Sequence, residues 1–282
     1  MSLREVQAFV TYYLRDPEFR EGYRNGSRDA LEAQLRLDNN DIKLVREINL
    51  DELDHIAVGF RDDRVAKRQS EYEEFLKHLG AYMDPAAFLA AYDRDYPGGL
   101  ETQSLELDRF LAFAVEFLST HRLPDYLISL AYFCYSFCKI AIAPVQKQGG
   151  PVEPGELHPY HSIRLREPYQ IAKFRYDVVR IAQSEPSSDL AGIPPQPTEL
   201  LIQKDHSLFK RAQVYYCSEL PLVGALLSGQ RMLFDLVSEL PSEDYHGFIN
   251  HISDLAHRGI IDVITPAYFG TYKSVAGNVV AR

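Results

Sequence analysis

The stretch that decides the fold is QVYYCSELPLVGALLSGQRMLFDLVSELPSEDYHGFINHISDLAHRGIIDVI, residues 213–264. It begins with a short run of strand-forming residues and continues through three closely spaced segments with apolar residues at helical spacing. We expect Gly229, Pro241 and Gly259 to end the three helices in turn. The apolar residues after Gly259 predict a short return strand.

The residues around these helices predict how each one begins. Ser218 is expected to cap the first helix, and the third is expected to start at Ser242 with Glu243 and Asp244 against its positive end. Strands are predicted both before and at the start of the quoted stretch, because short apolar or alternating runs occur there. These runs are Ser162–Leu165, Gln170–Tyr176, Glu199–Gln203 and Gln213–Cys217. Strands, three helices and a return strand together predict a winged-helix domain with a small antiparallel sheet.

The first half of the chain predicts helices throughout, so the fold class is α+β. Helical spacing ends at Asp16-Pro17, and Asp84-Pro85 provides an N-cap followed by proline at the first helical position. The charged run RDDRVAKRQSE, residues 61–71, is interpreted as a solvated helix face. The Gly- and Pro-rich stretch after residue 145 predicts a linker, and residues 184–197 predict a loop. The expected organisation is a helical bundle at 1–147, a linker at 148–158, a winged-helix domain at 159–270 and a tail at 271–282.

Composition narrows the class of partner and the compartment. The chain has 282 residues and a net charge of −10, with 18 basic and 26 acidic side chains in residues 1–154. Phosphate binding needs clustered Lys and Arg, yet the third helix, 245–258, contains one Arg and no Lys. We therefore expect no nucleic acid partner. The charged N-terminus and three cysteines favour a cytoplasmic protein, and residues 126–145 are interpreted as a buried helix rather than a membrane span.

Candidate metal or catalytic residues are few. Cys134 and Cys138 lie four apart on one helix, and His158 and His161 are conceivable further ligands. The cysteines lie among aromatic residues, however, which favours buried neutral thiols, and histidines beside prolines favour local hydrogen bonds in a loop. His251 and His257 lie six apart and so do not share a helix face. Scattered carboxylates are interpreted as solvated side chains, namely Glu52, Asp54, Asp62 and Asp63.

We expect no catalytic residue, metal site or cofactor in this chain, since the sequence lacks the common nucleotide-binding, nucleophile-elbow and zinc-protease motifs. The main alternative is a transcriptional regulator in which a helical effector domain is joined to a winged helix. A further alternative is a stand-alone helical enzyme that uses Cys134 and Cys138.

The segment VYYCSELPLVGALLSGQRMLFDLVSEL, followed by LAHRGIIDVI, resembles the RiPP recognition element, a PqqD-like domain that binds leader peptides of ribosomally made natural products. The resemblance covers the last 100 to 120 residues. A helical domain joined to such an element is similar to the accessory subunits that pair with multinuclear iron oxidases of the methanobactin type. KFRYDVVRI, residues 173–181, also resembles this group, most of all the 3-thiaglutamate partner protein.

The resemblance implies a non-catalytic subunit of a heterodimer. It would bind a leader or carrier peptide and present the peptide's cysteine-containing end to the partner oxidase, which would hold the iron.

Strand addition gives a physical reason for peptide binding, because an edge strand offers unpaired N–H and C=O groups to a guest strand. We expect this edge at Gln213, Val214, Tyr215, Tyr216 and Cys217, with Val214 and Tyr216 on one face. The opposing wall is expected from the third helix, through Tyr245, Phe248 and Ile252.

Overall fold

The structure is a computed structural model, and it describes residues 3–96, 102–145, 154–205, 211–239 and 244–265. The chain divides into two compact units. The helical unit comprises Met1–Tyr135 and Val178–Pro194, and the sheet unit comprises Ser136–Asp177 and Pro195–Arg282. The division differs from the single linker expected at 148–158, because the segment Val178–Pro194 belongs to the helical unit.

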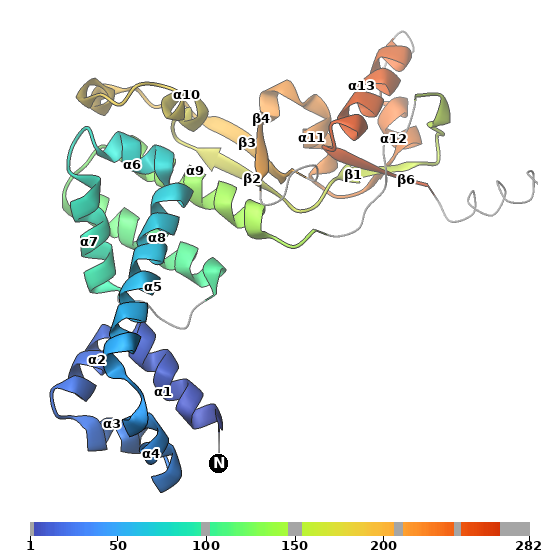
Figure 1. The fold of residues 1–282 in the computed structure, drawn as a ribbon. Helices are drawn as coiled ribbons and strands as arrows, with labels where there is room; N and C mark the ends of the chain where they lie inside the picture. Colours follow the sequence, from blue (N-terminus) through green and yellow to red (C-terminus); the bar gives the residue numbers. More distant parts are fainter. Residues whose placement is uncertain (1–2, 97–101, 146–153, 206–210, 240–243, 266–282) are drawn as a thin grey trace, which may run out of the picture. The chain divides into compact units, whose positions relative to one another are not determined.

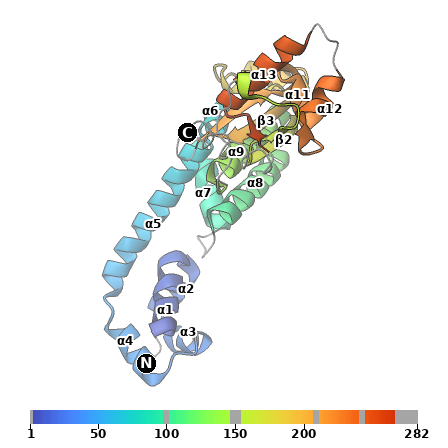
Figure 2. The ribbon, with the colours of Figure 1, turned by 90° about the vertical axis from the view of Figure 1, so that its right-hand side faces the viewer.

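The helical unit confirms that the N-terminal half is helical. Its long helix α5 runs alongside α1 (Figure 2). Figure 1 labels its α-helices, which are α1 (Leu3–Arg15), α2 (Pro17–Arg24), α3 (Arg28–Gln34), α4 (Asn39–Glu47), α5 (Leu50–Glu71), α6 (Glu73–Leu79), α7 (Pro85–Asp95), α8 (Gln103–Thr120), the first part of α9 (Asp125–Ile142) and α10 (Val178–Ala182). The unit also contains the 3-10 helix Ser188–Gly192.

Helix boundaries in this unit follow the local chemistry of the sequence. Asp16 ends α1 and accepts a hydrogen bond from the Phe19 backbone N–H, so it caps α2. Asp84 accepts from the Ala86 N–H, and Pro85 occupies the first turn of α7, as predicted. Apolar faces then pack into an aromatic core, in which Phe110 and Phe88 have ring centroids 5.8 Å apart.

Helix α9 is long and apolar enough to cross a membrane by length and composition alone. Half of its residues are buried within the protein. Its buried face includes Leu127, Leu130, Cys134 and Cys138. This pattern agrees with the interpretation of a buried helix.

The sheet unit contains two antiparallel sheets of three strands rather than the single small sheet predicted. One sheet has the strand order β5-β1-β6, and the other has the order β2-β3-β4. The predicted strand positions are nearly correct, but their pairing is not, because Gln213–Cys217 belongs to a different sheet from Ser162–Leu165. The strands are β1 (Ser162–Leu165), β2 (Tyr169–Phe174), β3 (Thr198–Lys204), β4 (Ala212–Tyr216), β5 (Arg231–Met232) and β6 (Ile261–Ile264).

Three helices follow β4, as predicted, and Figure 1 labels them α11 (Pro221–Leu226), α12 (Leu233–Ser238) and α13 (Tyr245–His257). Ser218 does not cap α11. It lies in a 3-10 turn, Cys217–Glu219, and α11 begins at Pro221. The predicted start of α13 at Ser242 and Glu243 lies outside the described residues. Gly259, with a φ of 73°, ends α13, and the Ile260 N–H donates to the Leu255 carbonyl.

One apolar core joins both sheets to the helices of the sheet unit. It contains Leu201 of β3, Ile163 of β1 and Ile252 of α13. A polar link connects the two sheets, because Gln203 Nε2 donates to the Ile260 carbonyl at 2.9 Å. These contacts fix the position of β4 within the unit.

Candidate functional site

Strand β4 lies at the edge of its sheet and pairs only with β3 in the described part of the chain. The Asp205 N–H donates to the Arg211 carbonyl, so Asp205 and Arg211 form a hydrogen-bonded pair between β3 and β4. In an antiparallel ladder hydrogen-bonded and non-hydrogen-bonded pairs alternate, so the next hydrogen-bonded pairs are Gln203 with Gln213 and Leu201 with Tyr215. Gln213 and Tyr215 therefore bond to β3. The backbone groups of Ala212, Val214 and Tyr216 point outward, away from β3. Strand addition requires such an outward row, and within the described residues no other strand pairs with β4 on the side of Ala212 and Val214.

The two faces of β4 carry different side chains. Val214 and Tyr216 share one face, as predicted, and the Tyr216 hydroxyl donates to Asp177 Oδ1 at 3.0 Å. Tyr215 lies on the other face, and it packs against the apolar core of the sheet unit. Its hydroxyl donates to Gln213 Oε1, and the Arg258 guanidinium lies 5.3 Å from its ring centroid. The residue that faces α13 is thus Tyr215.

The wall predicted from α13 is only partly accessible. Ile252 has no exposed surface and belongs to the core, so it supports the unit from inside. Phe248 is half-buried against the same core, whereas Tyr245 is exposed. None of these three residues lines the groove found beside β4.

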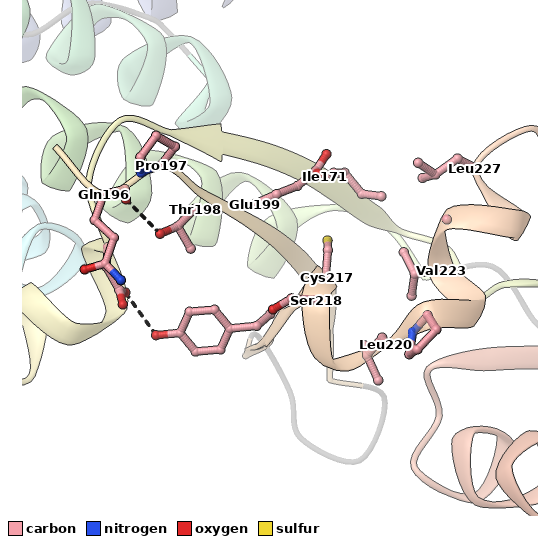
Figure 3. Close-up of a pocket in the computed structure, with 14 residues that line it drawn as sticks. Ile171, Gln196, Pro197, Thr198, Glu199, Cys217, Ser218, Leu220, Val223 and Leu227 are labelled. Carbon is pink, nitrogen blue, oxygen red and sulfur yellow. Dashed lines mark hydrogen bonds between the residues drawn. The ribbon is translucent and has the colours of Figure 1, made fainter.

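That groove has a volume of about 480 Å³ and lies where β4 ends, bounded by α11 rather than by α13. Figure 3 labels residues of this groove that come from β2, from β3, from the 3-10 turn after β4 and from α11. Ile171, Val223 and Leu227 form its apolar part, and Leu227 is half exposed. The groove was missed from the sequence because α11 starts after a 3-10 turn that no spacing rule predicted.

Two carboxylates give this groove its polarity. Asp177 and Glu199 line it together with Cys217. Burial, and then the nearby negative charge of Glu199, raises the pKa of the Cys217 thiol, while Lys173 opposes the shift. Cys217 is therefore a neutral thiol near pH 7. A partly apolar groove with two acids suits an apolar or basic guest side chain.

The candidate metal ligands do not assemble into a site in the described residues, where no group of three or more His, Cys, Asp or Glu side chains could hold a metal ion. Cys134 and Cys138 are buried on α9. The His158 N–H donates to His161 Nδ1 at 3.2 Å, and the His161 N–H donates to the His158 carbonyl at 2.9 Å. The two histidines thus form local hydrogen bonds in a loop, as predicted.

Of the four carboxylates predicted to be solvated, Glu52, Asp62 and Asp63 are exposed, whereas Asp54 is half-buried. Asp54 accepts from the Tyr13 hydroxyl at 3.0 Å and lies 2.6 Å from Arg24 Nη2. Most residues of the run 61–71 are exposed, as predicted for a solvated face, but Arg64 and Arg68 are largely buried. Arg64 Nε lies 2.7 Å from Glu106 Oε1.

Comparison with known proteins finds no family model that matches this chain. Among curated proteins, none matches. The resemblance to peptide-recognition elements therefore depends on the residues quoted above.

Proposed function

We propose that the sheet unit is a PqqD-like winged-helix element that binds an extended peptide as an additional strand along β4. The observation that carries the proposal is the outward row of backbone groups at Ala212, Val214 and Tyr216. A guest strand beside this row would form main-chain hydrogen bonds without disturbing the β3–β4 ladder. Affinity would then come from backbone pairing, and sequence preference from the side-chain surroundings.

The groove at the end of β4 supplies those surroundings. A guest chain that continues past Tyr216 reaches a partly apolar hollow with Asp177 and Glu199 in its wall. An apolar side chain would contact Leu227 and Val223, and a basic side chain would meet the carboxylates. We therefore propose a guest whose segment beyond the paired strand carries apolar or basic residues.

We further propose that the chain is a non-catalytic subunit, the partner of a multinuclear iron oxidase of the methanobactin type. It would hold a leader or carrier peptide while the cysteine-containing end of that peptide enters the partner's active site. The resemblance of KFRYDVVRI and of the stretch 214–264 supports this step. Iron would belong to the partner, so metal analysis of the co-expressed pair should find iron that follows the oxidase when the subunits are separated.

The binding mode is tested with a matched pair of variants at one position. Val214→Pro removes an outward N–H but no β3–β4 hydrogen bond, which an edge strand tolerates. Val214→Ala shortens the side chain and keeps the N–H. The probe is a fluorescent peptide selected from a displayed library of random 20-residue sequences against the full chain, and its affinity is measured by polarisation.

We expect Val214→Pro to weaken the affinity for this peptide at least tenfold and Val214→Ala to change that affinity less than threefold. The loss reflects one main-chain hydrogen bond together with steric exclusion by the proline ring. Equal affinity for the two variants, each with an unchanged circular dichroism spectrum, would overturn strand addition. A library that yields no binding peptide would overturn peptide recognition itself.

A further inference from the structure

A further cavity, lined by described residues of the helical unit alone, lies apart from the groove beside β4. It has a volume of about 600 Å³ and is lined from α1, α2, α5, α7 and α8. Its size is in the range of small-molecule sites, about 300–1,000 Å³. Nothing in the proposed peptide recognition uses this cavity, and its residues belong to the other unit.

The lining of this cavity is basic although the chain is acidic. Seven basic and four acidic side chains line it among the described residues, whereas residues 1–154 as a whole have 18 basic and 26 acidic. Two of the four acids are already neutralised, because Asp93 Oδ2 lies 2.6 Å from Arg61 Nε and Glu106 Oε1 lies 2.7 Å from Arg64 Nε. The remaining charge favours an anion.

Arg68 is the residue that most directly indicates a ligand. It is only 2% exposed, and its Nη2 lies 2.7 Å from Glu71 Oε2. Within the described ranges, its Nε and Nη1 have no hydrogen-bond partner, and Arg68 lines the cavity. A buried N–H donor without an acceptor is costly, more so on a charged group. An anionic oxygen in the cavity would supply the acceptor.

Glu71 does not account for this arrangement. Its Oε1 accepts from Gln103 Nε2 at 2.8 Å, and its Oε2 pairs with Arg68 through a single nitrogen. The Arg68–Glu71 pair is thus neutral overall, but only one of the three guanidinium nitrogens of Arg68 contacts the carboxylate. Gln103 also lines the cavity. Its hydrogen bond to Glu71 therefore holds the carboxylate that orients Arg68.

The rest of the wall is apolar. Leu14, Ala57, Phe60 and Ala90 line the cavity, and Phe60 is 48% exposed. A bare inorganic ion would leave these surfaces in contact with water, whereas an organic anion would cover them. The combination selects a ligand with an oxyanion at one end and an apolar body.

We propose that the helical unit binds an organic oxyanion, a carboxylate or a phosphate ester with an apolar body, and that Arg68 contacts its oxygens directly. The site is independent of the peptide edge in the other unit. Failure of anion binding and failure of peptide binding are therefore distinguishable, because the two proposals are tested with different ligands and with variants in different units.

Calorimetric titration of the full chain tests the proposal with benzoate, glutarate and phenyl phosphate as probes and benzyl alcohol as the neutral control. We expect at least one anion to bind with a Kd of 1 mM or tighter and benzyl alcohol not to bind. Preference for benzoate or for phenyl phosphate distinguishes a carboxylate ligand from a phosphate ligand. Absence of binding by all three anions would overturn the proposal.

Two variants locate the site, and one controls for charge. Arg68→Lys keeps the charge but loses donors, and Phe60→Glu adds a carboxylate at a half-exposed position that tolerates substitution. Each variant should weaken the affinity for the tightest-binding anion tenfold or more. Lys77→Gln, at an exposed position outside the cavity, should change that affinity less than threefold. Should Arg68→Lys fail to fold, Phe60→Glu decides alone. A smaller loss in the folded variants would place the anion elsewhere and contradict the proposal.

Discussion

At the scale of single residues, the informative side chains are the buried polar ones, which the sequence did not distinguish from solvated ones. Arg68 lies in a charged run that periodicity alone assigns to solvent, and only the packing of other helices around α5 buries it. Asp262 is likewise one acid among forty, yet it has no exposed surface. Burial of a charge depends on distant parts of the chain, so local patterns do not predict it.

Asp262 should be a large determinant of stability in the sheet unit. Its Oδ1 lies 2.8 Å from Arg166 Nε, and its Oδ2 lies 3.6 Å from Arg164 Nε. Asp262→Asn would leave two cations without their carboxylate, which costs about 3–5 kcal/mol for a buried pair. Urea unfolding measures the loss. Asp254→Asn, which removes an exposed pair with Arg258, should cost less than about 1 kcal/mol.

His78 should make stability depend on pH. It has no exposed surface, and burial, together with the nearby charge of Lys77, lowers its pKa from the ordinary 6.5. Above that pH the imidazole is neutral in both folded and unfolded chains. As the pH falls below 6.5, the unfolded chain binds the proton first, so the free energy of unfolding decreases.

The decrease should reach up to about 1.4 kcal/mol per pH unit until the lowered pKa is reached. The free energy of unfolding is measured at pH 7.5 and pH 5.5 for the wild type and for His78→Phe. The difference between the two proteins in how much this free energy changes with pH gives the contribution of His78. Identical slopes would show that His78 does not cause the dependence.

At the scale of helices and strands, local chemistry predicted most boundaries. Five of the six strands in the described residues, all except β5, and the caps at Asp84 and Gly259 lie within two residues of their predicted positions. The pairing of the strands was not predictable, because two short apolar strands can pair in several orders with similar burial. The groove next to β4 depends on that pairing. The sequence predicted β4 as an edge strand, and it lies at the edge of its sheet in the described residues. It did not predict that the groove beside β4 is bounded by α11 rather than by α13.

Two glycines of the α13 region should respond in opposite directions to alanine. Gly259 has a φ of 73°, and an added Cβ would lie 3.0 Å from Arg166 Nη1, so Gly259→Ala should cost about 1–2 kcal/mol. Gly247 lies inside the helix, and a Cβ there meets no described atom within 4 Å. Gly247→Ala should stabilise the protein by up to about 1 kcal/mol. Thermal unfolding of both variants checks the signs, and a shared sign would contradict this account.

At the scale of the whole molecule, the chain crosses between its two units three times. Val178–Pro194 lies in the helical unit, where Val178 and Ile181 are buried and the Tyr82 hydroxyl donates to the Ser187 carbonyl. Composition placed the boundary at the Gly- and Pro-rich stretch because such stretches usually separate domains. A later segment that returns to the first unit leaves no compositional signal.

A truncation at the predicted linker should therefore damage the helical unit. Residues 1–147 alone lack the buried side chains of Val178 and Ile181. A chain in which a flexible Gly/Ser linker joins residues 1–145 to 178–194 should melt at a higher temperature than residues 1–147. Circular dichroism measures both midpoints, and equal midpoints would contradict the division into units.

The most direct test of the account is amide hydrogen exchange along β4, followed by NMR with and without a saturating selected peptide. We expect the outward N–H groups of Ala212 and Val214 to exchange rapidly in the free chain and to become protected when the peptide binds. The N–H groups of Gln213 and Tyr215, which already bond to β3, should be protected in both states. Unchanged exchange at Ala212 and Val214 in the peptide complex would contradict strand addition at this edge.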